Sequence, residues 1–581
     1  MPEIKIDTLR HSTAHVLAKA VKRLHKDVQL GIGPVIEGGF YYDFGTKNVL
    51  GEEQFPIIEK EVRRIIAAKE PFKKEWLTIP KAVALFRKLK EPYKVELTKD
   101  LAKKGVKKVS VYWTGNDFVD LCTGPHVKNT ADIPPDAFTL TKAAAAYWRG
   151  DENNPQLKRV YGTVFITKEE LQKHLAIIDE AEKRDHKRLG VALDLFTFSE
   201  LVGSGLPLWT PKGTVVRSLL DEFVWQLRKT RGYLRVEIPH ITKKELYEIS
   251  GHWEKFKDEL FKITTREGHI FAMKPMNCPH HAQIFKRRQW SYRELPQRYA
   301  NTTMVYRDEQ TGELAGLSRT RAFTQDDAHV FCRKTQVKDE MLKIWDIIDI
   351  FYGAFGFSLT VRLSLHDPKH PKKYLGDRTI WRKAEGEIIV LARARGVKTI
   401  KAVGEATFYG PKIDFMAKDS LGREWQVATI QLDMNLPERF DLTCIDENGK
   451  SERVVMIHAA IMGSLERFLS ILIEHYAGDF PAWLASVQVR VIPIAERHAE
   501  YAHEVLQKLL NASIRAEVTN ANQTLGKSIR EGELAKIPYL IVVGDREIAQ
   551  NELSVRERKK EVRTNIKIED FIRELAKQRP F

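Results

Sequence analysis

The feature that most constrains the fold of this chain is a charged stretch with too few apolar residues to be buried in a hydrophobic core. Residues 168–188 read KEELQKHLAIIDEAEKRDHKR, which has helical spacing but only one narrow apolar stripe. A helix of this kind suits a position in solvent, bridging structures on either side of it. We therefore predict a helical linker at 168–189 and a chain of 581 residues divided into several domains, as its length also suggests.

The segment before this linker predicts an α+β domain over 1–167. Residues 7–26 carry apolar side chains at helical spacing, and residues 31–42 are rich in glycine and aromatic residues with β character. The N-terminus has no apolar signal segment, and no run in the chain approaches the roughly 18 apolar residues of a membrane span. We expect no membrane association.

Two further changes of pattern follow the linker. From 190 to 483, long helical segments alternate with strands that glycine-containing turns often join, so antiparallel pairing is expected. The predicted strands include 302–306, 323–324 and 425–432. After Trp483, short strands and helices alternate, which predicts an α/β domain with a largely parallel sheet over 484–581.

Charge and cysteine usage narrow the class of protein. The 94 Lys and Arg residues exceed the 78 Asp and Glu residues by 16, which favours a polyanionic partner such as nucleic acid, although a solvated basic surface explains the excess equally well. No C-x-x-C pair occurs among the cysteines, so a disulfide framework is not expected and a reducing cytoplasm fits best. The four cysteines are Cys122, Cys278, Cys332 and Cys444.

The middle segment contains two stretches with the chemistry of a phosphate site. The first runs from MVYRDE at 304–309 through a glycine-containing loop to RTRAF at 319–323, and the second is GSLERF at 463–468. An arginine at a strand end presents a rigid fork to a phosphate. Taken singly, each stretch is more simply read as an ordinary surface strand or helix.

Together the two stretches resemble motifs 2 and 3 of class II aminoacyl-tRNA synthetases, and residues 206–239 resemble motif 1. The segments MKPMNCPHH, RAFTQDDAHVFC, FYGPKIDF and VVMIHAAIMGSLERF resemble the threonyl-tRNA synthetases in particular, and the similarity extends from His11 to the C-terminus. The resemblance implies an α+β multidomain fold with an antiparallel class II catalytic core, an α+β editing domain and a C-terminal α/β anticodon-binding domain. It also implies a homodimer that acts on ATP, L-threonine and tRNA(Thr), with Mg²⁺ accompanying ATP.

The family holds a catalytic zinc ion through one cysteine and two histidines, which fall here on Cys278, His329 and His458. Their separations match no local zinc motif, so each residue alone would be read as part of a core. The resemblance implies that threonine offers its amino and hydroxyl groups to this ion. Valine lacks the hydroxyl, and a site built for a polar group rejects such an analogue by roughly 10⁴–10⁵.

The resemblance also assigns the remaining residues of the catalytic centre. It implies a threonine pocket formed by Asp327, Gln325, Tyr409 and Gln431. It implies ATP contacts from Arg307 at the α-phosphate, Glu309 at the adenine edge, Phe323 and Arg467 on the two ring faces, and Arg319 and Gln426. It assigns catalytic roles to Arg307, Arg467 and Lys412.

A second candidate site lies near the N-terminus, where His11 and His15 are four residues apart on a predicted helix and Cys122 and His126 form a similar pair. Chemistry alone suggests a zinc site, or for the first pair an exposed helix face. The resemblance implies instead an editing site that hydrolyses seryl-tRNA, with bound zinc as the lesser alternative. It adds Tyr42, Lys94 and Asp120 to this pocket.

Several expectations concern the rest of the chain. The resemblance implies anticodon contacts from Asn522, Glu547 and Arg556, which otherwise read as surface residues of an α/β domain. The family usually has a small domain ahead of the editing domain, which this sequence lacks, and glycine where His280 stands. The rival interpretations, a regulatory RNA-binding protein with an inactive centre and a freestanding deacylase, would both leave the reactive residues unused.

Overall fold

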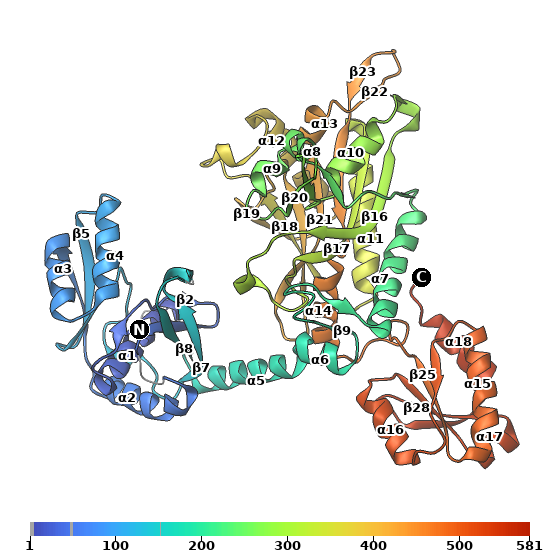
Figure 1. The fold of residues 1–581 in the computed structure, drawn as a ribbon, viewed down its shortest axis with the longest axis horizontal. Coiled ribbons are helices and arrows are strands. Elements are labelled where there is room, and N and C mark those ends of the chain that lie inside the picture. Colours follow the sequence, from blue (N-terminus) through green and yellow to red (C-terminus); the bar gives the residue numbers. More distant parts are fainter. Residues whose placement is uncertain (1–4, 47–49, 152) are drawn as a thin grey trace. The chain divides into compact units, whose positions relative to one another are not determined.

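The computed structural model of the protein describes residues 5–46, 50–151 and 153–581 (Figure 1). Residues 1–4, part of the terminus read as lacking a signal segment, lie outside the described residues. The chain forms two compact units, Met1–Asp179 and Glu180–Phe581, and the division falls within helix α5 (Lys168–Arg184), inside the stretch predicted as a linker. No helix in the described ranges is both long and apolar enough to cross a bilayer.

The first unit packs helix α1 (Ile6–Leu24) and helix α2 (Phe55–Ala67) around an antiparallel sheet. The apolar residues of α1 recur three and four positions apart, so that Leu9, Val16, Leu17 and Ala20 are all buried. The strands of this sheet are β1 (Gln29–Leu30), β2 (Val35–Ile36), β3 (Gly39–Gly45), β7 (Phe138–Tyr147) and β8 (Gln156–Val164).

A smaller antiparallel sheet completes the first unit, and helices α3 (Ile79–Lys88) and α4 (Pro92–Lys103) lie beside it (Figure 1). Alternation along its strands places Val109 and Val111 in a small core with Phe86 of α3. Intervening residues such as Ser110 and Tyr112 occupy the other face of the sheet. The strands are β4 (Phe72–Thr78), β5 (Lys108–Thr114) and β6 (Phe118–Leu121).

The second unit is built on an eight-stranded sheet in which the expected antiparallel pairing dominates; only the two outermost pairings are parallel. The strand order is β11 (Leu234–Arg235), β16 (Gln297–Tyr306), β17 (Ala322–Cys332), β24 (Val455–Ala460), β21 (Glu424–Asp433), β20 (Lys412–Lys418), β18 (Leu359–Leu365) and β19 (Thr399–Val403). The three strands predicted from the sequence are present, but each is longer than predicted.

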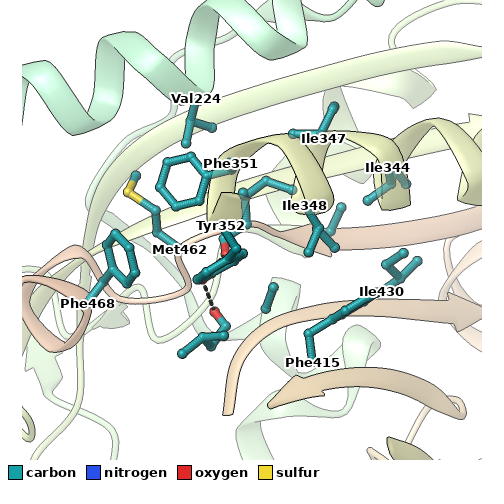
Figure 2. Close-up of a cluster of buried hydrophobic side chains, with 14 of the residues drawn as sticks. Val224, Ile344, Ile347, Ile348, Phe351, Tyr352, Phe415, Ile430, Met462 and Phe468 are labelled. Carbon is teal, nitrogen blue, oxygen red and sulfur yellow. Dashed lines mark hydrogen bonds between the residues drawn. The ribbon is translucent and has the colours of Figure 1, made fainter. Parts of the chain in front are cut away.

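One face of this sheet is covered by helix α11 (Val337–Gly353), whose apolar side chains pack against strand and helix residues (Figure 2). The buried Tyr352 hydroxyl donates to the carbonyl oxygens of Ile461 at 2.7 Å and Val427 at 3.1 Å. Ile461 follows β24 directly and Val427 lies in β21, so this core residue ties the two strands together. Helices α7 (Pro211–Lys229), α12 (Arg378–Ala394) and α14 (Leu465–Tyr476) contribute to the same core.

The C-terminal part of the second unit is an α/β layer with strand order β26-β25-β27-β28-β29. Helices α15 (Ala499–Asn511) and α18 (Ile568–Lys577) pack on one core, and α16 (Leu525–Leu534) packs on another. The prediction of a largely parallel sheet is wrong, because only the two pairings of β25 are parallel. The strands are β25 (Val489–Pro493), β26 (Ala516–Val518), β27 (Tyr539–Val543), β28 (Leu553–Glu557) and β29 (Val562–Ile566).

Candidate active sites

Three metal-ligand side chains that are distant in sequence meet in the second unit. Cys278 is the first residue of helix α10 (Cys278–Lys286), while His329 of β17 and His458 of β24 face each other in strand register. All three are buried, their candidate ligand atoms lie within 4.8 Å of one another, and His329 Nε2 is 3.0 Å from His458 Nδ1. Strand pairing therefore brings together what sequence spacing could not.

Neighbouring groups leave the facing nitrogens of both histidines free to bind a cation. His458 Nε2 is 3.0 Å from the carboxylate of Asp433, and His329 Nδ1 is 2.8 Å from Nδ1 of His281. Burial lowers the pKa of His329 and raises the pKa of the Cys278 thiol. A neutral imidazole is the form that binds zinc, and a bound cation favours the thiolate, so this donor set fits the zinc ion that the family implies.

Sequence reasoning did not identify Asp433, His281 or the buried His252, whose Nε2 lies 3.5 Å from Cys278 Sγ. His280, the residue that departs from the family, is also buried, and neither of its ring nitrogens has a hydrogen-bond partner among the described residues. Its presence does not separate the three candidate ligands.

The residues assigned to threonine surround this group. Asp327 of β17 accepts a hydrogen bond from Asn277 Nδ2 at 3.2 Å, and burial raises the pKa of the Asp327 carboxyl to about 6. The Tyr409 hydroxyl donates to Gln431, and the Tyr409 ring stacks on His458 with centroids 4.8 Å apart. Gln325 lies on the same strand as Asp327, two residues earlier, and its amide oxygen is buried.

A cavity of about 540 Å³ adjoins this pocket. Within it, Arg319 donates to the Glu309 carboxylate through Nε at 2.9 Å. The Arg307 guanidinium lies 5.4 Å from the Phe323 ring centroid, and burial lowers the pKa of Arg307. All six residues assigned to ATP line the cavity: Arg307, Glu309, Arg319, Phe323, Gln426 and Arg467.

Lys412 does not line this cavity, but the carboxylate of Asp414 links it to Gln426, which does. Its ammonium group lies 3.1 Å from Asp414, and the other Asp414 oxygen accepts a hydrogen bond from Gln426 Nε2 at 2.8 Å. Arg362 donates to the Gln426 carbonyl oxygen at 3.1 Å. Asp414 and Arg362 therefore orient two of the predicted residues; Asp414 lies within the FYGPKIDF segment but was assigned no role there, and no motif included Arg362.

His186, to which no role was assigned from the sequence, joins three segments of the second unit. This buried residue is the first of helix α6 (His186–Ala192), and it lies inside the stretch 168–189 that was predicted as a linker. Its Nε2 accepts the backbone N–H of Leu317 at 3.1 Å, and its Nδ1 lies 2.6 Å from Glu474 of α14. Leu317 directly precedes Ser318 and Arg319 of the cavity wall, so His186 holds one end of the loop that forms this part of the wall.

In the first unit, the four residues His11, His15, Cys122 and His126 also meet, with candidate ligand atoms within 4.8 Å of one another. The Cys122 sulfur is 3.2 Å from both His11 Nε2 and His126 Nε2. Burial lowers the pKa values of all three histidines and raises the pKa of Cys122 to about 11. His15 is buried, so the alternative of an exposed helix face is wrong for this residue.

The other residues predicted for this site form a second layer. The Tyr42 hydroxyl donates to Asp120 at 2.5 Å, and Lys94 forms an ion pair with the same carboxylate. Asp120 also lies 3.8 Å from His15 Nε2. The free-energy cost of burying the charges of Lys94 and Asp120 is offset because the two charges pair with each other.

Ser12 is a further member that sequence reasoning missed. Its hydroxyl donates to Thr8 O at 2.8 Å and accepts the backbone N–H of Val127 at 3.0 Å. Because the hydroxyl proton is committed, His126 Nδ1, 3.2 Å from Ser12 Oγ, must be the donor of their contact. His126 then presents a lone pair on Nε2 toward Cys122.

The structure does not bring the three predicted anticodon residues into one hydrogen-bonded group. Asn522 lies in the loop between β26 and α16, Glu547 in helix α17 (Asp545–Gln550) and Arg556 on β28. The Glu547 carboxylate accepts from Gly544 N at 2.9 Å and Ser554 Oγ at 2.7 Å, and Arg556 pairs with Glu533 at 3.0 Å. The side chains of Glu547 and Arg556 are thus each engaged with their own surroundings.

Three family models match successive parts of the chain. Residues 109–161 match the threonyl and alanyl tRNA synthetase second additional domain. Residues 261–476 match the class II tRNA synthetase core domain for G, H, P, S and T, and residues 488–578 match an anticodon binding domain. The quartet of the first unit, the catalytic cavity of the second unit and the C-terminal layer are thus associated with three separate families of domain.

Relatives that align with most of this chain support the same family assignment. The threonine–tRNA ligase of Gloeobacter violaceus is 48% identical over 561 residues, covering 95% of this chain and 89% of the relative. A threonine–tRNA ligase of Thermus thermophilus is 47% identical over 566 residues, covering 95% and 85%. A solved structure described as the RNA binding domain of threonyl-tRNA synthetase from Cryptosporidium parvum has a TM-score of 0.65 and 34% identity, covering 68% of this chain and 98% of that one. The chain therefore belongs to the threonine–tRNA ligase family of class II aminoacyl-tRNA synthetases.

Proposed function

We propose that this chain activates L-threonine with ATP, transfers it to tRNA(Thr), and hydrolyses seryl-tRNA(Thr) in its N-terminal unit. Family membership makes the chain a threonine–tRNA ligase, and its match to the second additional domain supports editing. The observation that carries the proposal is the meeting of Cys278, His329 and His458 beside the cavity lined by Arg307 and Arg467.

In the first step, a threonine carboxylate oxygen attacks the α-phosphorus of ATP and pyrophosphate leaves. We assign Arg307 to the α-phosphate, because its guanidinium is buried at the cavity wall and forms no ion pair with a carboxylate of the described residues. Arg467 and Phe323 hold the adenine ring, Glu309 its edge, and Arg319, Gln426 and Lys412 the remaining polar groups. Positioning and neutralisation of charge account for most of the rate enhancement in such a reaction.

Cys278, His329 and His458 would hold zinc. When bound, that ion supplies a Lewis-acidic site for the threonine amino and hydroxyl groups. The buried Asp327 is placed to accept a hydrogen bond from the threonine hydroxyl, with Gln325, Tyr409 and Gln431 around it. Mg²⁺ is proposed to accompany ATP. In the second step a ribose hydroxyl of the tRNA attacks the threonyl carbonyl carbon, and AMP leaves.

Serine creates the need for the second site. It offers the same amino and hydroxyl groups and lacks one methyl, a difference of only about 1–3 kcal/mol, or roughly 10–200-fold. We propose that His11, His15, Cys122 and His126 position water for attack on the seryl ester. The lowered pKa values of the histidines keep them neutral, so that each ring retains a nitrogen lone pair that can accept a hydrogen bond from the water. Tyr42, Lys94 and Asp120 support this arrangement.

The remaining proposals concern partners and domains. Asn522, Glu547 and Arg556 would contact the anticodon, and the chain would act as a cytoplasmic homodimer. The resemblance of residues 206–239 to motif 1 supports a second copy there. We propose the division into 1–167 for editing, 168–189 as linker, 190–483 for catalysis and 484–581 for anticodon binding.

The experiment is aminoacylation of tRNA(Thr) with threonine, serine and valine, before and after zinc removal. We expect threonine charging that is lost on removal and restored by zinc, with valine rejected in both states. Tight tRNA binding without charging of any amino acid would contradict the proposal and favour a regulatory role.

A further inference from the structure

The cavity of the editing site is much larger than its reaction requires. It encloses about 810 Å³, within the roughly 300–1,000 Å³ typical of pockets for whole small-molecule ligands. The catalytic residues His11, His15 and Cys122 line only one part of it. The remaining wall consists of α4, the loop after it, the sheet β4-β5-β6, residues 32–34 and Arg149. This extension needs a ligand larger than a seryl group.

An exposed tryptophan stands in that extension. Trp76 lies on β4, is 61% exposed and lines the cavity. Its strand neighbour is Ser110 of β5, whose hydroxyl donates to the Cys122 carbonyl oxygen at 2.7 Å. The indole therefore lies on the same sheet face as the catalytic cysteine, one residue pair away. An exposed aromatic face beside a reactive centre is a stacking surface for a planar group.

Positive charge surrounds the indole. The Lys74 ammonium group lies 4.9 Å from its ring centroid, Lys108 lies two residues from Ser110 on the same sheet face, and Lys104 lines the same cavity. Neither Lys104 nor Lys108 forms an ion pair within the described ranges, whereas Arg149 of the same wall is neutralised by Glu96 and Asp100. Two uncompensated ammonium groups beside an aromatic ring suit a ligand that is both anionic and aromatic.

We propose that Trp76, Lys104 and Lys108 form a platform for the 3′-terminal nucleotides of the tRNA, with the indole stacked on a base and the lysines at phosphates. This proposal rests on the proposed editing function. The seryl ester is attached to the terminal ribose, so a base of the same nucleotide lies within reach of a residue one strand pair from Cys122. The platform would let the site select esters of tRNA over free seryl esters.

The test measures deacylation of seryl-tRNA(Thr) by the full chain and its Trp76→Ala and Trp76→Phe variants. Trp113→Phe is the matched control, because this residue of β5 bonds to Glu75 on the opposite sheet face. We expect Trp76→Ala to raise KM about 5- to 150-fold, the equivalent of the ~1–3 kcal/mol that base stacking contributes, with little change in kcat. Trp76→Phe should recover most of this. An unchanged KM in Trp76→Ala would overturn the proposal.

The lysines have a separate readout. The Lys104→Ala/Lys108→Ala variant should show a shallower dependence of log KM on log salt, by about 0.7 for each phosphate that a lysine no longer neutralises. The control is Lys107→Ala, an exposed neighbour that does not line the cavity. Equal salt slopes for the wild type, the double variant and the control would contradict a role in binding phosphate.

A binding measurement separates this proposal from editing itself. The probe is tRNA(Thr) with 2-aminopurine as its 3′-terminal base, added with threonine and a non-hydrolysable ATP analogue that fill the catalytic site. Stacking quenches 2-aminopurine, so quenching should be strong in the wild type and weak in Trp76→Ala. If the wild type hydrolyses no seryl-tRNA, the proposed editing function is wrong, and the quenching signal alone tests the binding platform. Equal quenching in the wild type and Trp76→Ala would refute the platform.

Discussion

His126 and His458 each have one ring nitrogen engaged by a neighbour, and this decides which lone pair faces the chemistry. Ser12 commits Nδ1 of His126, and Asp433 commits Nε2 of His458. Neighbours of this kind orient metal ligands and catalytic bases, and they affect function nearly as strongly as the ligands do. Ser12 and Asp433 both lie far from their histidines in sequence, so no spacing could have identified them.

Removing Asp433 should weaken metal binding. In Asp433→Ala, His458 loses the acceptor for its Nε2 proton, and we expect zinc affinity to fall about 10- to 100-fold. Competition with a chromophoric chelator measures the affinity. Asp441→Ala, an exposed change on the same unit, is the control. Equal zinc affinity in Asp433→Ala and the wild type would contradict the assigned geometry.

Acid should destabilise the first unit through His15. Its folded pKa lies well below the unfolded value of 6.5, so as pH falls through 6.5 the unfolded chain binds a proton that the folded chain does not. Between pH 6.5 and 5.5 this single histidine should remove about 1 kcal/mol of stability. Hydrogen exchange of the slowest α1 amides measures the loss, which should be smaller in His15→Gln and unchanged in His25→Gln.

At the scale of elements, the loop that forms part of the wall of the proposed ATP cavity is held by a residue outside the class II motifs. His186 accepts the Leu317 N–H and contacts Glu474 of α14, so the first turn of α6 ties this loop to the helix that carries Arg467. A buried N–H that loses its acceptor costs about 1–3 kcal/mol. The position of the loop therefore depends on α6.

The two nitrogens of His186 can be tested separately. In His186→Gln the side chain retains an acceptor near the Nε2 position, whereas in His186→Asn it retains only a group near Nδ1. We expect KM for ATP in pyrophosphate exchange to rise about 5-fold or more in His186→Asn and much less in His186→Gln, with kcat changing less than KM. Equal KM values in the two variants would show that the Leu317 contact does not position the loop.

The helices and strands also show which parts of the fold could be predicted from the sequence and which could not. The linker helix, α1 and the antiparallel core were predictable, because each has a clear apolar period. The hairpin of β28 and β29 was not, because both strands are short and carry charged residues such as Arg556 and Arg563, and so the C-terminal sheet was predicted as largely parallel. The three candidate zinc ligands came only from the family resemblance, since β17 and β24 become neighbours through tertiary pairing.

For the whole molecule, the proposed function makes accuracy depend on two chemically different selections on one chain. In that proposal the second unit rejects valine by its missing hydroxyl, but it cannot reject serine strongly by one missing methyl. The proposed editing quartet in the first unit would act on the product rather than on the amino acid. Neither site alone accounts for accurate charging, and the two compact units allow each to be inactivated without disturbing the other's core.

The most direct test is serine charging of tRNA(Thr) by the wild type and by His11→Ala/His15→Ala, with threonine charging measured in parallel. We predict that seryl-tRNA accumulates only in the variant, while both proteins charge threonine at similar rates. Seryl-tRNA accumulating equally in both proteins, or in neither, would contradict the assignment of editing to the N-terminal unit.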